Sequence, residues 1–201
     1  MGRRPRRGTR VSRTLPASQR RAALLDATHE LVVEHGVGGT SIDRVAARAG
    51  VSKGAVYHHF ASKDELVAAL EQRFTDGILG RARAAADAAP EGAPPGEVLA
   101  AWTAGVVHGY LDDLALHDAL FHGRPVTGRE ALSDNVLVTD LRAFLLDRGA
   151  READLVAGFV VGGITTAVDR AVLAGRSEPR DPVVAVAVAC ARGAAGLTLT
   201  P

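Results

Sequence analysis

Apolar side chains recur at helical spacing along most of this chain, and glycine or proline residues interrupt the pattern at intervals. The first third of the chain predicts four helices, of which the second and third are short. The first helix is expected to begin at Ser18, a residue type that caps helix N-termini, and to close at Gly36. The second ends at Gly50, and its apolar stripe consists of Ile42, Val45, Ala46 and Ala49.

A third helix starts at Ser52, only two residues after that glycine, and ends by Phe60. The segment Ser62-Lys63-Asp64-Glu65 has the form of a capping box, which predicts a fourth, longer helix. Val183–Val188 has the composition of a buried strand, but Asp181-Pro182 before it favours the start of a helix. The chain is therefore predicted to be all-α, with about nine helices, the later ones at residues 97–117, 128–148, 152–174 and 182–197.

Two short helices joined by a glycine turn, all within residues 41–60, have the layout of a helix-turn-helix motif. Gly50 suits the tight turn, and Val51 follows it at the corner between the helices. Gly54 and Ala55 keep the second helix slim enough to enter a DNA major groove about 12 Å wide. The spacing alone leaves a second interpretation open, in which the two short helices have a purely structural role.

Charge is unevenly divided along the chain. Residues 1–60 carry eleven Lys/Arg against four Asp/Glu, a net charge of +7, whereas residues 61–201 have a net charge of −6. Six arginines lie within residues 1–17, which lack apolar periodicity, so we expect a disordered basic arm there. This asymmetry predicts a polyanion-binding end and a separate acidic body. Both contact of the arm with DNA and a purely solvated arm remain open.

Several functional classes find no support in the composition. Cys190 is the single cysteine, so an internal disulfide and a thiolate metal cluster are excluded. No uncharged apolar run approaches the roughly 20 residues of a membrane span, and no apolar stretch follows the basic N-terminus as in a signal peptide. A nucleophile elbow, a zinc motif and a phosphate loop are all missing. We therefore expect a cytoplasmic protein without a cofactor, a metal or an enzymatic activity.

The residues themselves favour the DNA-binding interpretation of the motif. From Ile42 to Leu66 they read IDRVAARAGVSKGAVYHHFASKDEL, preceded by LDATHEL from Leu25 and by EHG from Glu34. This stretch closely resembles the signature of the TetR family of transcriptional regulators, and the resemblance covers about residues 18–78. It departs from the family pattern at Val33, where an aromatic residue is usual, and at His29, where a small one is usual. Both positions affect the packing of the first helix rather than DNA binding.

The resemblance implies three segments: an arm at 1–17, a helix-turn-helix DNA-binding domain at 18–78, and a ligand-sensing and dimerisation domain at 79–201. The residues at the start of the recognition helix, the end that meets base edges, would be Ser52, Lys53, Gly54 and Ala55. Phosphate contacts are implied for hydroxyls at the start of the motif and for three later positions, although helix capping is an equal alternative for the hydroxyls. These residues are Thr40, Ser41, Tyr57, His58 and Lys63. Val56 and Phe60 are expected to lie in the core.

Small and β-branched residues dominate the last two predicted helices, about 152–174 and 182–197. In the TetR family the last two helices form the dimer interface, so the resemblance implies a homodimer through them. A bundle within one chain would have the same composition. Cys190 is expected to be a small buried residue in this setting rather than a nucleophile.

The middle of the chain holds the candidates for ligand binding, which are Trp102, His108, Tyr110 and Phe121. A role in the core is the stronger interpretation for Trp102 and Phe121. Asp113 and His117 are four residues apart, as a metal-binding pair on one helix face would be, but no third ligand accompanies them.

The sequence as a whole predicts a regulator that binds operator DNA and a small-molecule effector, with repression relieved by ligand as the default. An activator of the same fold is the alternative. A small α-helical metalloenzyme lacks the necessary motifs, and an architectural DNA protein would be basic throughout.

Overall fold

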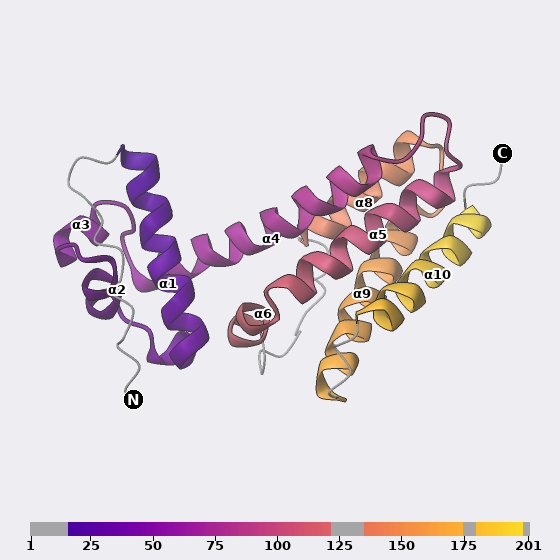
Figure 1. Cartoon of the computed structure of the whole chain (residues 1–201). Coiled ribbons are helices and arrows are strands. Elements are labelled where there is room, and N and C mark those ends of the chain that lie inside the picture. The colour runs from indigo at the N-terminus through magenta and orange to yellow at the C-terminus, as the bar shows by residue number, and fades with distance from the viewer. Residues whose placement is uncertain (1–15, 122–134, 175–179, 199–201) are drawn as a thin grey trace. The chain divides into compact units, whose positions relative to one another are not determined.

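The computed structural model describes residues 16–121, 135–174 and 180–198, and these ranges form nine helices and no strand (Figure 1). The all-α prediction is confirmed. Residues 1–15 of the predicted basic arm lie outside the described residues. Helix α1 begins at Ala17 after Pro16, so Ser18 is inside the helix and does not cap it.

The chain divides into two compact units. The first contains α1 (Ala17–Gly39), α2 (Ile42–Ala49), α3 (Lys53–Tyr57), the part of α4 (Lys63–Asp87) up to Phe74, and α6 (Leu114–Phe121) from Ala115 on. The second contains the rest of α4, together with α5 (Pro95–Asp112), α8 (Val136–Asp147), α9 (Ala153–Leu173) and α10 (Asp181–Thr198). Helix α4 therefore contributes residues to both units.

The first unit is built around the apolar stripes that the sequence predicted. Leu24, Ala27, Thr28 and Leu31 of α1 and the four stripe residues of α2 are buried, and α1 is interrupted at Gly36 as predicted. Gly50 ends α2 with φ +68°, a left-handed conformation that glycine adopts without steric cost. Val56 and Phe60 are 0% and 1% exposed, which confirms them as core residues. These contacts hold α1, α2 and α3 together as one tight cluster.

Helix α4 starts as the capping sequence predicted, with one change of detail. The Ser62 hydroxyl accepts a hydrogen bond from the Glu65 amide at 3.1 Å. The Glu65 carboxylate accepts from the Ala61 amide at 2.5 Å, one residue earlier than in a standard capping box. Leu66, Leu70 and Phe74 form the buried seam of this part of α4.

In the second unit, α5 packs against α9 and α10, and α9 also packs against α8 and α10 (Figure 1). Helices α4 and α5 approach each other closely at two glycines of α5. A Cβ atom built on Gly105 would lie 2.7 Å from the Cα of Ala82 and 2.9 Å from the carbonyl oxygen of Arg81. Because these neighbours are backbone atoms, only glycine permits this crossing distance. Gly109 makes a similar approach to Ile78.

Two sequence-based expectations need correction. The helix expected at 97–117 ends at Asp112, because Asp113 has non-helical angles (φ −133°, ψ 51°), and α6 then begins at Leu114. The spacing argument that placed Asp113 and His117 on one helix face therefore does not apply. Cys190 is exposed in the single chain, so its expected burial at a dimer interface stays a prediction. Val183–Val188 is helical, as predicted.

By length and composition, α9 is the one helix of the described ranges that is apolar enough to cross a membrane, and 33% of its most apolar window is buried. A helix from the core of a soluble bundle passes the same test, so this is weak evidence for a membrane span.

Candidate nucleic-acid interface

Helices α2 and α3 are connected by a short turn in which serine side chains cap both helix starts. Ser41 accepts a hydrogen bond from the Arg44 amide at 3.3 Å, and Ser52 accepts one from the Ala55 amide at 3.2 Å. Both capping contacts satisfy amide groups that helix geometry leaves without a partner. The start of α3 is therefore fixed by the sequence of the turn itself.

One face of α3 is open to solvent while the other is anchored in the core. Ser52, Lys53, Gly54, Tyr57 and His58 are exposed, Ala55 is half-buried, and Val56 is fully buried. Nothing but the Ser52 hydroxyl, at 3.9 Å, lies near a Cβ built on Gly54, so the helix surface is low at this point. The structure thus brings together the recognition-helix residues named from the sequence, and Tyr57 is 48% exposed beside them.

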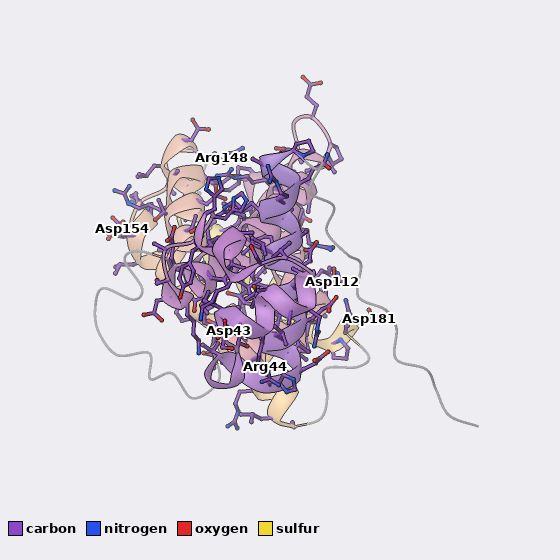
Figure 2. The ribbon with its side chains drawn as sticks, turned by 90° about the vertical axis from the view of Figure 1, so that its left-hand side faces the viewer. Asp43, Arg44, Asp112, Arg148, Asp154 and Asp181 are labelled. Atoms are coloured by element: carbon purple, nitrogen blue, oxygen red, sulfur yellow. The ribbon has the colours of Figure 1, made fainter. Side chains whose placement is uncertain are left out.

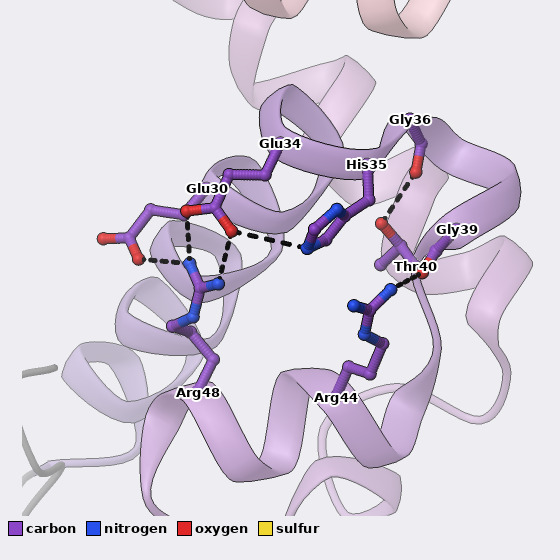
Figure 3. A network of polar contacts seen from close by, with 8 residues as sticks. All are labelled: Glu30, Glu34, His35, Gly36, Gly39, Thr40, Arg44 and Arg48. Carbon is purple, nitrogen blue, oxygen red and sulfur yellow. Dashed lines mark hydrogen bonds and ion pairs between the residues drawn. The ribbon is translucent and has the colours of Figure 1, made fainter. Parts of the chain in front are cut away.

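The remaining predicted contact residues differ in accessibility. Thr40 is 2% exposed, and its hydroxyl donates to the carbonyl of Gly36 at 2.9 Å, so the side chain closes α1 (Figure 3). Ser41 and Lys63 are half-buried. Ser41 caps the start of α2, which is the alternative that the sequence left open, whereas Thr40 caps the end of α1.

Lys53, the first residue of α3, forms an ion pair with Asp43 of α2. The ammonium nitrogen lies 2.9 Å from Oδ1 and 3.1 Å from Oδ2 of the carboxylate. The side chains are 53% and 69% exposed. The hydrogen bond to Asp43 raises the pKa of Lys53 above its ordinary value. Figure 2 shows Asp43 beside Arg44 on the surface of α2.

A second polar network joins α2 to α1 (Figure 3). The Arg48 guanidinium donates to Glu34 at 2.6 and 3.1 Å and to Glu30 at 2.9 Å. The hydrogen bond from Arg48 lowers the pKa of Glu34, and the hydrogen bonds to Glu34 and Glu30 raise that of Arg48. These contacts of Arg48 with Glu30 and Glu34 (the Arg48 clasp) and the ion pair of Asp43 were not predicted from the sequence. Two glutamates four residues apart on α1 were a signal that could have indicated the clasp.

In the second unit, a cavity of about 380 Å³ opens between α4, α5 and α8. Asp140 of α8 is its central polar group, because its carboxylate accepts from the indole Nε1 of Trp102 at 3.0 Å and from Arg83 of α4 at 2.5 Å. Trp102 is 1% exposed, and Phe144 of α8 also lines the cavity, with the Arg148 guanidinium 3.8 Å from its ring centroid.

The four ligand candidates from the sequence are not brought together. Trp102 lines the cavity, whereas His108 is exposed and Tyr110 is 7% exposed on the same helix. Burial raises the pKa of Tyr110 to about 12. Phe121 belongs to the first unit, where its ring lies 6.1 Å from Phe74. Within the described ranges, no group of three or more His, Cys, Asp or Glu side chains could hold a metal ion.

Helices α9 and α10 carry an apolar surface that this chain leaves uncovered. Phe159, Leu155 and Val186 are 72%, 69% and 58% exposed. No atom lies within 4 Å of a Cβ built on Gly158, Gly162, Gly163 or Gly193, so these glycines do not serve close packing within the chain.

Residues 24–70 match the family of bacterial regulatory proteins described as the tetR family. A TetR-like transcriptional regulator from Rhodococcus sp. RHA1 superposes on 91% of this chain and 98% of its own, with a TM-score of 0.62 and 26% sequence identity. The chain carries the DNA-binding domain of the TetR family. The match lies on the unit that carries the α2–α3 motif, and the structural likeness extends over the helical second unit as well. TetR-family proteins are transcriptional regulators rather than enzymes.

Two curated relatives share the N-terminal part of this chain. The transcriptional activator FasR of Mycolicibacterium smegmatis is 43% identical over 82 residues, which is 41% of this chain and 37% of FasR. The transcriptional repressor KstR2 of Mycobacterium tuberculosis is 38% identical over 66 residues, 33% of each chain. The matched stretch thus spans about a third of each relative, and one relative is an activator whereas the other is a repressor.

Proposed function

We propose that this protein is a sequence-specific DNA-binding transcriptional regulator that reads an operator with α3 and acts as a ligand-released repressor. The observation that carries the proposal is the two-faced α3, which is anchored by Val56 and open at Ser52, Lys53, Gly54 and Tyr57. A helix of this kind places its N-terminal residues against base edges in the major groove. Repression is the default for the proposal, and activation, as in FasR, is the alternative.

The proposed DNA contacts divide into two kinds. Ser52, Lys53, Gly54 and Ala55 face the bases, where the lysine donates to a guanine or to a phosphate. The backbone contacts come from residues around this helix, with Thr40 and Ser41 contributing helix-terminal groups rather than free hydroxyls because both are capping residues. These backbone-contacting residues are Thr40, Ser41, Tyr57, His58 and Lys63.

Replacing Lys53 or Tyr57 with alanine tests the DNA interface. Each change should weaken operator binding by roughly 1–3 kcal/mol for a base contact, and by less for one phosphate contact. Fluorescence anisotropy on a duplex selected by the wild-type protein from a random pool measures the loss. Val33→Ala is the control, because this α1 residue is 39% exposed and lies outside the proposed interface. Undiminished affinity of both variants, with helical circular dichroism retained, would remove α3 from the interface.

We further propose that two copies of the chain pair through α9 and α10. These helices expose an apolar surface made of Phe159, Leu155, Val186 and glycines that face open space. Burying this surface against the same helix pair of a second copy would remove apolar area from water. Cys190 would be covered in such a dimer. A dimer presents two recognition helices about 34–36 Å apart, or at a wider family spacing, to a palindromic operator. Such a regulator acts in the bacterial cytoplasm, where its operator is.

The effector site proposed here is the cavity beside Trp102, with α4 as the connection, because this helix belongs to both units. A ligand that prefers a state with the wrong spacing of recognition helices would release the operator. Trp102 is the single tryptophan of the sequence, so its fluorescence reports on this cavity alone. A screen of hydrophobic metabolites should find a compound that changes this fluorescence and releases DNA. Compounds that bind tightly but leave DNA affinity untouched would contradict the coupling.

A further inference from the structure

The ion pair between Lys53 and Asp43 places a negative charge inside the surface that is proposed to meet DNA. The ammonium nitrogen and the nearer carboxylate oxygen are 2.9 Å apart, and both side chains are more than half exposed. The pair joins the first turn of α2 to the first residue of α3, so it connects the N-terminal ends of the two helices of the motif. The positive charge of Lys53 is therefore partly offset by Asp43 before any nucleic acid binds.

The other basic side chains of α2 are engaged elsewhere. Arg44 donates to the carbonyl of Gly39 at 2.6 Å, and Arg48 is held by Glu30 and Glu34. Asp43 thus acts on Lys53, its neighbour across the turn. An exposed ion pair of this kind contributes little to stability and exchanges readily, because water and salt screen it. We therefore expect the Lys53–Asp43 pair to affect DNA binding more than the stability of the fold.

A phosphate that binds Lys53 competes with the carboxylate of Asp43 for the ammonium group and lies close to that carboxylate. The exchange replaces one anionic partner by another and leaves an unpaired carboxylate next to a polyanion, so a non-specific contact gains little. A guanine edge offers Lys53 directed acceptors that compensate for the loss of Asp43. The loss of the Asp43 partner is therefore compensated better at a guanine edge than at a phosphate.

We propose that Asp43 is a specificity-determining residue, which suppresses non-specific DNA binding by offsetting the charge of Lys53 and permits its release at the operator. The inference rests on the proposed function, since it concerns how the same surface distinguishes operator from other DNA. Asp43 contacts no base in this mechanism. It acts through Lys53.

The test is Asp43→Asn in the full-length protein, with affinities measured on two duplexes over a series of KCl concentrations. One duplex is selected from a random pool by the wild-type protein, and the other is a scrambled duplex of the same length and composition. Affinity for the scrambled duplex should rise, and the slope of log K against log salt should steepen by about 0.9 for each Lys53 that gains a phosphate. Affinity for the selected duplex should rise less, so the specificity ratio falls.

Asp26→Asn is the matched control, because Asp26 is 68% exposed, lies in the same unit and pairs with Arg73 instead of a recognition-helix residue. It changes the net charge by the same amount. Equal effects of the two variants would overturn the proposal, since long-range charge alone would explain them. A second check is Asp43→Asn in a Lys53→Met background, where the substitution should have almost no effect on either duplex.

Other outcomes are also decisive. If Asp43→Asn changes the preferred base at one position of the selected duplex and leaves the salt slope unaltered, Asp43 contacts a base directly and the proposal is wrong. If the wild-type protein selects no duplex at all, the proposed function fails and this inference fails with it. Selection by the wild type with unchanged behaviour of Asp43→Asn would refute the inference alone.

Discussion

Replacing Gly105 with alanine should destabilise the protein, although the same change stabilises most helix interiors. The added Cβ would lie 2.7 Å from the Cα of Ala82, where ordinary contacts are about 3.4–4 Å. Neither backbone can rotate away, so α4 and α5 must separate by roughly 1 Å and lose part of their packing along this crossing.

The size of the effect follows from two opposing contributions. Overpacking of a tight contact costs typically 1–3 kcal/mol, while alanine gains up to about 1 kcal/mol over glycine in a helix. We expect a net loss of about 1–2 kcal/mol in the free energy of unfolding. For a chain of this size that lowers Tm by roughly 2–8 °C.

Gly80→Ala provides the matched control, because Gly80 lies on the exposed side of α4 with no atom within 4 Å of a built Cβ. This variant should be stabilised by about 0.5–1 kcal/mol. Urea unfolding followed by Trp102 fluorescence measures both variants, at one protein concentration because association affects stability. A Gly105→Ala protein as stable as Gly80→Ala would show that the helices do not cross as closely as described.

Two further predictions concern the clasp on α2 and the apolar face. Arg48→Met keeps the aliphatic stem but leaves Glu30 and Glu34 facing each other, so operator affinity and Tm should both fall. Because Arg48 holds the pKa of Glu34 below its ordinary value of 4.5, the contact stabilises the fold above that pH and is lost as the pH falls and Glu34 protonates. Unfolding of the variant should therefore depend less on pH in this acidic range, and an unchanged pH profile would count against the clasp. Phe159→Lys should give a folded monomer in analytical ultracentrifugation, and this monomer should bind the operator weakly. The control Leu146→Lys changes an α8 residue that is 49% exposed, and this variant should remain dimeric. A dimeric Phe159→Lys protein would place the interface elsewhere.

Local patterns determined the first unit almost completely. The apolar stripe of α2, the turn at Gly50 and the serine caps at Ser41 and Ser52 each act within a few residues of the chain, so their spacing in the sequence was sufficient. Val56 and Phe60 form an apolar pair four residues apart in this segment, and both are buried as expected.

Contacts between distant residues were decided by the tertiary structure. Glu30 and Arg48 are eighteen residues apart, and Trp102 and Asp140 are thirty-eight apart, so no local periodicity relates them. The exposure of Cys190 and the helix break at Asp113 likewise depend on which neighbours pack against a segment. The sequence gives no sign that position 105 requires glycine. The requirement follows from the close crossing of α4 and α5 at this residue. Side-chain spacing determines which face of a helix is apolar, whereas the partner of that face depends on the path of the whole chain.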